Sequence, residues 1–333
     1  MTHVRIGRKV PALEVEFEIE GVTALFGPAG AGKTLILESI AGFVRPDSGR
    51  ILRDDVLLFD AEARVHVPPR RRASSYLPQR DALFPHMTLR QNLAFAAAGA
   101  RLERHRRITE MLEKFQLADA AACRPAELDV DQRARTAVAR ALIATPKLLL
   151  LDEPDFPEAL FFQMRGEFKG PILLATRSLD RCAALADQML VLDRGRILRR
   201  GAPRDVIDQP ESVAVARLLG IPNLFECTIA ELDPGRNSSR LEFPGFQIAA
   251  PYLPGHFRGD RVWISIRPER VRVHAGEHAV TARLVRVSYR PEWVRLEFDG
   301  GLVADVAPEE YARQKDNKEW RLELPADSLR VLA

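Results

Sequence analysis

The stretch GPAGAGKT at positions 27–34 constrains the fold of this chain more than any other. It matches the spacing G-x-x-x-x-G-K-[ST], follows the hydrophobic run VTALF and precedes the helical pattern TLILESIAGF. In such a loop, glycines let successive backbone N–H groups point at phosphate oxygens, and the positive end of the next helix points at the same place. Strand, glycine-rich loop and helix in this order favour a phosphate-binding loop over an ordinary glycine-rich turn.

The loop also predicts which residues would hold a nucleoside triphosphate. Lys33 supplies a mobile cation for the β- and γ-phosphates, and the Thr34 hydroxyl supplies a ligand for Mg²⁺. We therefore expect a nucleoside triphosphate and Mg²⁺ at this loop. The expected cradle consists of Gly27, Pro28, Ala29, Gly30, Ala31, Gly32, Lys33 and Thr34.

A second stretch, LLLLDEP at 148–154, is a hydrophobic run that ends in two carboxylates. A buried strand that emerges beside a phosphate loop can place Asp152 near the Mg²⁺ ion and Glu153 where a water would attack the γ-phosphate. A strand that merely ends in an acidic turn is the alternative for these two residues alone. The phosphate loop upstream favours the catalytic interpretation.

The pattern of apolar runs predicts an α/β domain. Short runs that read as buried parallel strands occur at 148–151, 172–175 and 189–193, and helical stretches at 156–168 and 178–187 separate them. Strands that alternate with helices favour a largely parallel sheet.

After about residue 222 the sequence pattern changes to short runs rich in Val, Ile, Leu and aromatic residues, and PG, GD, DGG and NS separate these runs. This pattern is typical of a small all-β barrel or sandwich. We expect two domains, an α/β P-loop domain at 1–221 and an all-β, OB-like barrel at 222–333.

Composition restricts the setting of the protein. A chain of 333 residues is long enough for two domains. Its net charge of +3 comes from scattered arginines, so no basic block indicates a nucleic-acid-binding surface. The three cysteines, Cys123, Cys182 and Cys227, are odd in number and far apart, which favours a reducing, intracellular compartment. No apolar run approaches the ~18–20 residues of a membrane-spanning helix. Work at a membrane would therefore require docking through a partner.

Taken together, these motifs resemble the ATP-binding subunits of ABC transporters, of the importer kind with a C-terminal regulatory β-domain. GPAGAGKT is similar to the family's Walker A, LLLLDEP to its Walker B, and SSYLPQRDALFPHMTLRQNLAF to its Q-loop region. The resemblance implies that Gln79 reaches both Mg²⁺ and the membrane partner, and that Glu153 and Gln79 are catalytic. It also implies Mg²⁺ ligation by Thr34, Gln79 and Asp152.

Within the family, VTALFGPAGAGKT and PPRRRASSYLPQRDALFPHMTLRQNL most resemble the molybdate-importer ATPases. The IRPE stretch also occurs in iron, sulfate and polyamine relatives, so the transported solute stays open. The resemblance implies an integral-membrane permease, a substrate-binding protein and a second ATPase subunit as partners. It implies a cytoplasmic location on the inner face of the cell membrane, with the homodimer and the heterodimer both open.

The first departure from the family pattern is the signature Leu-Ser-Gly-Gly-Gln, which here reads Leu128-Asp129-Val130-Asp131-Gln132. By resemblance, this segment faces the γ-phosphate held by the other subunit. A carboxylate ~5 Å from that phosphate at an effective dielectric near ~20 costs on the order of 3 kcal/mol. Asp is also a good N-cap, so either Asp129 or Asp131 could begin the following helix.

Further departures follow. Arg177 stands where the family has its switch histidine, and guanidinium stays charged and only donates hydrogen bonds. It could clamp the γ-phosphate or form a surface salt bridge. DFPEAL replaces the family's dimer loop after DEP, and Phe17 is the candidate for stacking on adenine.

We therefore expect Mg-ATP binding with slow hydrolysis. An energising importer subunit and a non-hydrolysing, regulatory nucleotide-binding subunit both fit the sequence, and a nucleic-acid ATPase is a remote third.

Overall fold

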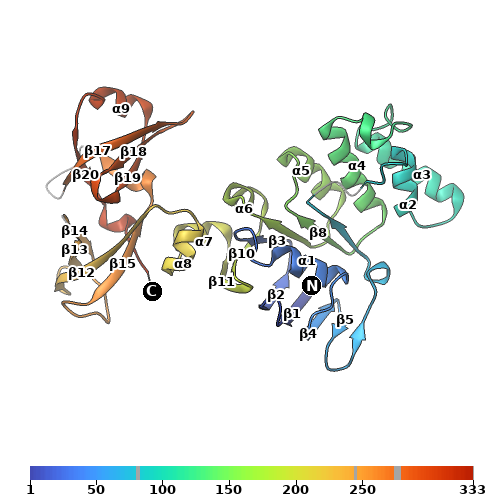
Figure 1. The fold of residues 1–333 in the computed structure, drawn as a ribbon, viewed down its shortest axis with the longest axis horizontal. Coiled ribbons are helices and arrows are strands. Elements are labelled where there is room, and N and C mark those ends of the chain that lie inside the picture. The colour runs from blue at the N-terminus through green and yellow to red at the C-terminus, as the bar shows by residue number, and fades with distance from the viewer. Residues whose placement is uncertain (80–82, 244–245, 274–278, 333) are drawn as a thin grey trace. The chain divides into compact units, whose positions relative to one another are not determined.

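The computed structural model describes residues 1–79, 83–243, 246–273 and 279–332 (Figure 1). Contacts divide the chain into two compact units, Met1–Val206 and Ile207–Ala333. This division falls earlier in the chain than the boundary expected between 221 and 222. The domain limits 1–221 and 222–333 themselves stay a prediction.

The first unit contains a sheet of eleven strands in the order β6-β5-β4-β1-β2-β11-β10-β3-β9-β8-β7. The strands are β1 (Thr2–Arg8), β2 (Leu13–Ile19), β3 (Val22–Phe26), β4 (Ser48–Arg53), β5 (Val56–Asp60), β6 (Val65–His66), β7 (Ser74–Leu77), β8 (Leu148–Asp152), β9 (Ile172–Thr176), β10 (Gln188–Asp193) and β11 (Arg196–Gly201). Strands β10, β3, β9, β8 and β7 are parallel neighbours. The predicted parallel strands and the α/β fold are therefore confirmed.

Helices cover both faces of this parallel region. They are α1 (Lys33–Ala41), α2 (Leu89–Ala96), α3 (Arg101–Lys114), α4 (Val130–Ile143), α5 (Glu158–Glu167) and α6 (Leu179–Leu185), and α7 (Pro203–Asp208) crosses the division between the units. In β8, Leu148 and Leu150 join a hydrophobic cluster with α1, whereas Leu149 and Leu151 join a cluster with α4 and α5. Figure 1 shows α2 to α5 gathered together and α1 apart from them. Because both faces are covered, β3, β8 and β9 are buried throughout and consist mostly of apolar residues.

The far end of α1 is held by a buried arginine. Arg72 has no exposed surface and donates hydrogen bonds to the carbonyl oxygens of Ser39 and Ile40, both at 2.8 Å. Burial and the nearby Arg53 lower the pKa of Arg72 to about 10. Gly42, at φ 89°, ends the helix beside it, and a Cβ there would lie 2.5 Å from Arg72 Nε. Arg72 therefore stabilises the negative end of the helix whose other end faces the phosphate loop.

The second unit contains two five-stranded antiparallel sheets, in the orders β14-β13-β12-β15-β21 and β16-β20-β17-β18-β19. Their strands are β12 (Asn223–Asp233), β13 (Ser238–Phe243), β14 (Phe246–Pro251), β15 (Arg261–Ile266), β16 (Arg272–Val273), β17 (Val280–Tyr289), β18 (Val294–Phe298), β19 (Val303–Val306), β20 (Glu319–Glu323) and β21 (Arg330–Leu332), with helices α8 (Val213–Leu218) and α9 (Pro308–Gln314). Both sheets contribute to one core, which includes Ile229, Leu296 and the fully buried Trp320. The prediction of an all-β, barrel-like second part is confirmed.

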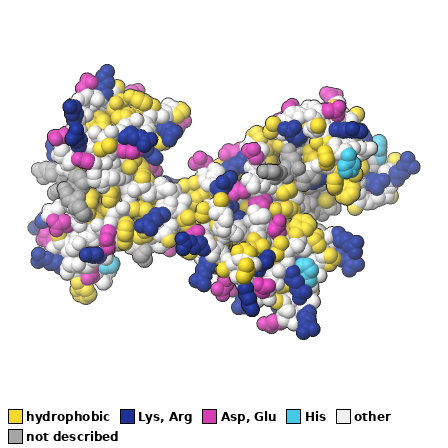
Figure 2. Space-filling view, in the orientation of Figure 1, with side chains coloured by type: hydrophobic (Ala, Val, Ile, Leu, Met, Phe, Trp, Pro, Cys, Tyr) yellow, Lys and Arg dark blue, Asp and Glu magenta, His cyan; other side chains and the backbone are white. Residues whose placement is uncertain are grey.

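The surface carries no concentrated basic block on the face drawn in Figure 2, where lysine and arginine side chains are scattered among acidic and apolar ones. In the described part of the chain, no helix has the length and apolarity to cross a bilayer.

Candidate functional site

The loop at 27–34 requires its glycines. A Cβ on Gly27 would lie 2.2 Å from the carbonyl oxygen of Leu192, so the backbone passes too close to β10 for a side chain. Gly32 is the N-cap of α1 at φ 107°, a left-handed conformation that other residues rarely adopt. The helix then begins at Lys33, with its N-terminal N–H groups and positive dipole end at the loop. Such a geometry can bind an anion through backbone N–H groups.

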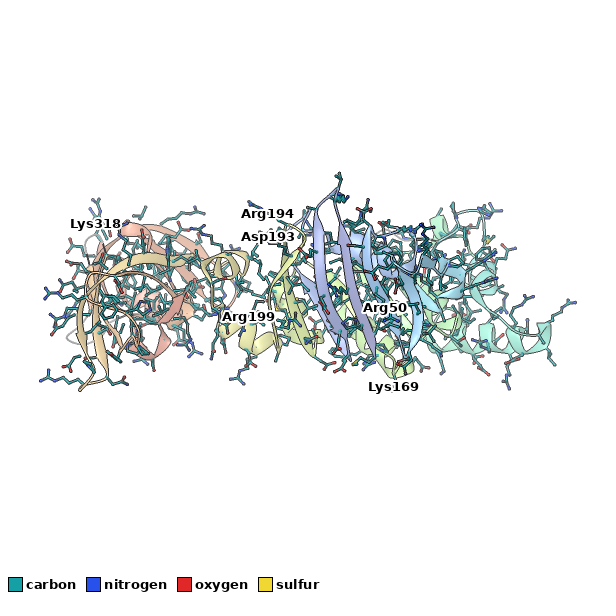
Figure 3. All side chains as sticks on the ribbon, turned by 90° about the horizontal axis from the view of Figure 1, so that it is seen from below. Arg50, Lys169, Asp193, Arg194, Arg199 and Lys318 are labelled. Atoms are coloured by element: carbon teal, nitrogen blue, oxygen red, sulfur yellow. The ribbon has the colours of Figure 1, made fainter. Side chains whose placement is uncertain are left out.

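A neighbouring turn fixes the loop from one side. The N–H of Gly195 donates to the carbonyl oxygen of Ala31 at 2.9 Å, and the Gly195 carbonyl accepts from the N–H of Glu14 at 2.8 Å. Figure 3 labels Asp193 and Arg194 of this turn, which joins β10 to β11. The phosphate loop is thus tied to the β2 and β10–β11 region of the sheet.

Lys33 is the buried cation of the site, with only 6% of its side chain exposed. Its Nζ donates to the carbonyl oxygens of Gly27 (2.7 Å) and Pro28 (3.0 Å). It also lies 3.1 Å from Oε1 of Glu153. The structure therefore brings the lysine of the phosphate loop into direct contact with the second carboxylate of LLLLDEP.

Glu153 is held in an unusual conformation at the end of β8. Its φ is 47°, in the left-handed region that is uncommon outside glycine, and its N–H donates to the carbonyl oxygen of Ala175 at 2.9 Å. Arg177 binds its carboxylate twice, with the backbone N–H 3.1 Å from Oε2 and Nε 3.4 Å from Oε1. Strained backbone at such a position is a frequent feature of functional sites.

Only one of the two carboxylate oxygens of Asp152 accepts a hydrogen bond from the described residues. Its side chain is buried, and Oδ2 accepts a hydrogen bond from the Tyr76 hydroxyl at 3.0 Å. Oδ1 is also buried and has no hydrogen-bond partner among the described residues. Burial and the Asp152 carboxylate raise the pKa of Tyr76 above its usual value, so the phenol remains a donor. An orphaned carboxylate oxygen is the donor type that Mg²⁺ prefers, and the site fits that ion.

The other two predicted magnesium ligands lie on exposed surface. Thr34 occupies the first turn of α1 next to Lys33. Gln79 is exposed after β7, and within the described residues no hydrogen bond joins it to Asp152 or Glu153. The remainder of the predicted Q-loop segment includes 80–82, which lie outside the described residues.

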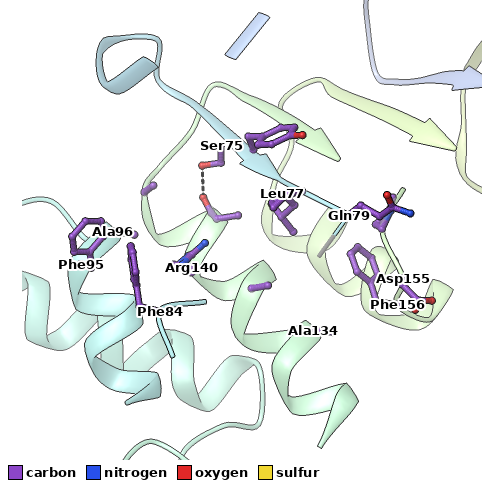
Figure 4. Close-up of a pocket in the computed structure, with 16 residues that line it drawn as sticks. Ser75, Leu77, Gln79, Phe84, Phe95, Ala96, Ala134, Arg140, Asp155 and Phe156 are labelled. Carbon is purple, nitrogen blue, oxygen red and sulfur yellow. Dashed lines mark hydrogen bonds between the residues drawn. The ribbon is translucent and has the colours of Figure 1, made fainter. Parts of the chain in front are cut away.

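Gln79 lines a groove of about 290 Å³ between β7, α2, α4 and the loop after Glu153. Figure 4 shows Gln79, Asp155 and Phe156 on one side and Phe84, Phe95 and Ala96 on the other. The hydroxyl of Ser75 donates to the carbonyl oxygen of Ala141 at 2.7 Å and joins β7 to α4. The phosphate site and the groove meet at the short segment that follows β8.

The altered signature segment forms a regular helix start. Asp129 is the N-cap of α4, and its carboxylate accepts from the N–H of Gln132 at 2.7 Å while the Gln132 side chain accepts from the Asp129 N–H at 3.2 Å. Asp131 pairs with Arg135 at 2.7 Å, and Val130 is 65% exposed. Of the two alternatives for capping, Asp129 is confirmed. The carboxylates of Asp129 and Asp131 therefore both lie at the positive, N-terminal end of α4.

The prediction that Phe17 stacks on adenine is wrong. Phe17 is 2% exposed and packs in the cluster between the sheet and α1, because it shares the inward face of β2 with Leu13 and Val15.

Sequence reasoning missed two contributors to the site. Tyr76 reaches Asp152 because β7 and β8 are parallel neighbours, and its place at the end of a strand was the available signal. Arg181 lies four residues after Arg177, in α6, and its guanidinium donates to the carbonyl oxygens of Pro154 and Phe156. This arginine fixes the segment DFPEAL to the start of α6.

Comparisons with known proteins agree with this geometry. The ABC transporter family model matches residues 11–155. The molybdenum import ATP-binding protein ModC of Brucella suis is 36% identical over 251 residues, 71% of this chain and 70% of that protein. The spermidine/putrescine import ATP-binding protein PotA of Nitrosospira multiformis is 33% identical over 276 residues, 79% of this chain and 74% of that protein.

A solved structure of an ATP-binding subunit of an ABC transporter superimposes with a TM-score of 0.53 at 26% identity, over 66% of this chain and 93% of that one. Sequence relatives, family model and fold thus agree on one family. The chain belongs to the ABC transporter family, among its ATP-binding subunits.

Proposed function

We propose that this chain is the ATP-binding subunit of an importer, which binds Mg-ATP through residues 27–34 and energises uptake through a partner permease. The contact of Lys33 with both the loop carbonyls and Glu153 carries the proposal, because it joins a phosphate-binding cation to a candidate base. Both similar proteins described above are import ATP-binding proteins.

The residues have separate tasks in this proposal. The backbone N–H groups of the loop, with Lys33, bind the β- and γ-phosphates. Asp152, through its open Oδ1, Thr34 and Gln79 would hold Mg²⁺, which neutralises charge on the phosphates. Glu153 orients a water and accepts its proton. Gln79 would have to turn from the groove toward the phosphate site, and this turn would link the two.

The groove beside Gln79 is the proposed docking site of the permease. Phe95 is 67% exposed and packs edge-on against Phe84 with ring centroids 4.6 Å apart. Exposed aromatic side chains around a hollow are typical of protein interfaces. Docking there would place the chain on the inner face of the cell membrane, with a second ATPase subunit and a substrate-binding protein completing the transporter.

We further propose that hydrolysis is slow. A helix N-terminus attracts one anion well, and in α4 the Asp129 carboxylate occupies that position, with Asp131 beside it. A γ-phosphate presented by another subunit would meet negative charge where the family offers a serine and glycines. The same observation favours the second candidate, a non-hydrolysing regulatory subunit.

The proposed cargo is an oxyanion such as molybdate. Similarity to ModC supports this choice, and the comparable similarity to PotA keeps a polyamine as the competing cargo.

Steady-state ATP hydrolysis by the purified chain, with Lys33→Ala as the blank and a parallel titration of Mg-ATP, tests the proposal. Binding with turnover just above the blank supports the slow subunit, and binding without turnover supports the regulatory one. Absence of Mg-ATP binding would overturn both.

A further inference from the structure

The Glu153 carboxylate is enclosed by two cations and an amide. Lys33 Nζ and Arg177 Nε both approach Oε1, at 3.1 and 3.4 Å, and the Arg177 N–H donates to Oε2 at 3.1 Å. The Glu153 side chain is 17% exposed and that of Lys33 6%, so their contact is shielded from water, whereas the side chain of Arg177 is 57% exposed. A largely buried lysine needs an anionic or polar partner, and this carboxylate supplies one.

The sheet explains why Arg177 is the residue that reaches Glu153. Strands β8 and β9 are parallel neighbours in which Asp152 pairs with Ala175. The residues that follow the two strand ends therefore emerge side by side. Four residues after Arg177, Arg181 donates hydrogen bonds to the carbonyl oxygens of Pro154 and Phe156, so the backbone after Glu153 is held as well. Because these contacts hold the backbone on both sides of Glu153, we expect its carboxylate to separate from Lys33 through a change of side-chain conformation.

In the proposed function, Lys33 and Glu153 have to separate before each can act on the nucleotide. A triphosphate bound in the loop needs the Lys33 cation, and the Glu153 carboxylate already contacts it. A carboxylate that makes these contacts must also give them up before it can orient a water and accept its proton.

We propose that Arg177 is a positioning residue that latches the Glu153 carboxylate onto Lys33, and that binding of the terminal phosphate of ATP has to open this latch. This inference rests on the proposed binding of Mg-ATP. In it, Arg177 acts through Glu153 and is not itself a phosphate ligand. The latch lowers the affinity for ATP and releases Glu153 only when the phosphate is in place.

A double-mutant cycle of Arg177→Gln and Glu153→Gln tests the latch, with affinities for Mg-ATP and Mg-ADP measured by calorimetric titration. Each single variant should bind Mg-ATP roughly twofold to fivefold more tightly than the parent chain, the range expected for loss of a partly exposed ion pair. The double variant should gain no more than the better single variant. Mg-ADP, which lacks the terminal phosphate, should gain less.

Arg194→Gln is the matched control, because it removes one positive charge from the turn beside the loop without touching Glu153; its side chain is 93% exposed. Weaker Mg-ATP binding in Arg177→Gln, in both backgrounds, would show a direct phosphate ligand and overturn the latch. Additive effects, or a gain equal to that of the control, would also overturn it.

Thermal unfolding without added nucleotide gives an independent readout. Arg177→Gln should lower the melting temperature in the parent chain but much less in the Glu153→Gln background. Equal shifts in both backgrounds would overturn the contact. Failure of the parent chain to bind Mg-ATP would overturn the proposed function, whereas binding that none of the variants changes would overturn the latch alone.

Discussion

Restoring the glycine-rich signature should raise the hydrolysis rate. The variant carries Asp129→Ser, Val130→Gly and Asp131→Gly together, so that the start of α4 again offers a hydroxyl and unobstructed amides. In the structure, Asp129 caps the helix and Asp131 pairs with Arg135 at 2.7 Å, so both carboxylates are fixed near the N-terminus of α4. If this end faces the γ-phosphate of another subunit, removal of both charges stabilises the bound phosphate.

The magnitude follows from Coulomb's law and from the helix start. Each carboxylate ~5 Å from a phosphate charge is worth about 3 kcal/mol at an effective dielectric near ~20. Lys33 and Mg²⁺ compensate part of this repulsion. Half of the energy of one carboxylate still corresponds to roughly a tenfold change in the hydrolysis rate. The same changes should lower the stability of α4 by about 1–2 kcal/mol. Serine caps the helix as well as Asp does, but the two glycines and the lost ion pair weaken its first turn.

The assay is steady-state phosphate release at saturating Mg-ATP, over a range of protein concentrations that detects dependence on dimer formation. Lys33→Ala in the restored chain is the blank. Glu110→Gln is the control for loss of one surface ion pair and one negative charge, because Glu110 pairs with Arg106 at 3.4 Å, four residues apart on the surface of α3. We expect the restored chain to hydrolyse ATP at least tenfold faster than the parent, and the control to match the parent.

An unchanged rate in a restored chain that folds and binds Mg-ATP would refute the reasoning, since the two carboxylates would then not limit hydrolysis. An equal rise in the Glu110→Gln control would refute it as well, because the effect would come from net charge.

Four further predictions concern stability and the thiols. Arg72→Met should lower the free energy of unfolding in urea by about 3–5 kcal/mol, because two helix carbonyls lose a buried charged donor. Asn223→Ala should cost about 2–3 kcal/mol in the second unit, where this buried side chain binds both backbone groups of one β19 residue at 2.7 Å. A thiol reagent at pH 8 should label Cys123 in the native chain but not Cys182 or Cys227, whose pKa burial raises to about 12. Both thiols ionise at a lower pH in the unfolded chain than in the folded one. The free energy of unfolding should therefore fall as pH rises from about 8.5 towards 12.

The parallel strands and the phosphate loop were predictable because their signals are local. Each buried strand is a continuous apolar run, and the loop has a fixed spacing of glycines and lysine. Strands β1 and β4 were not predicted, because each has one solvated face: Arg5 and Arg50 are exposed while alternate residues are buried. Such mixed strands resemble surface loops when apolar runs are the criterion.

The contacts within the site were harder to predict, because they depend on which strands are neighbours. Tyr76 lies far from Asp152 in sequence and reaches it only because β7 pairs with β8. The Arg177–Glu153 pair likewise depends on β8 lying beside β9. The error on Phe17 was avoidable, since the alternation of LEVEFEI already puts it on the same side as Leu13.

The close approach of Gly42 to Arg72 limits how this sequence can diverge. Any side chain at position 42 would collide with the guanidinium, and any shorter residue at position 72 would leave the last carbonyls of α1 without their donor. Single changes at either position are therefore expected to be deleterious, and a shorter residue at position 72 would not free position 42, because the φ of 89° there disfavours residues other than glycine. A combinatorial library at these two positions should therefore retain glycine at position 42 and arginine at position 72 in its functional clones, and residue 72 should emerge as a distant determinant of the helix that carries Lys33.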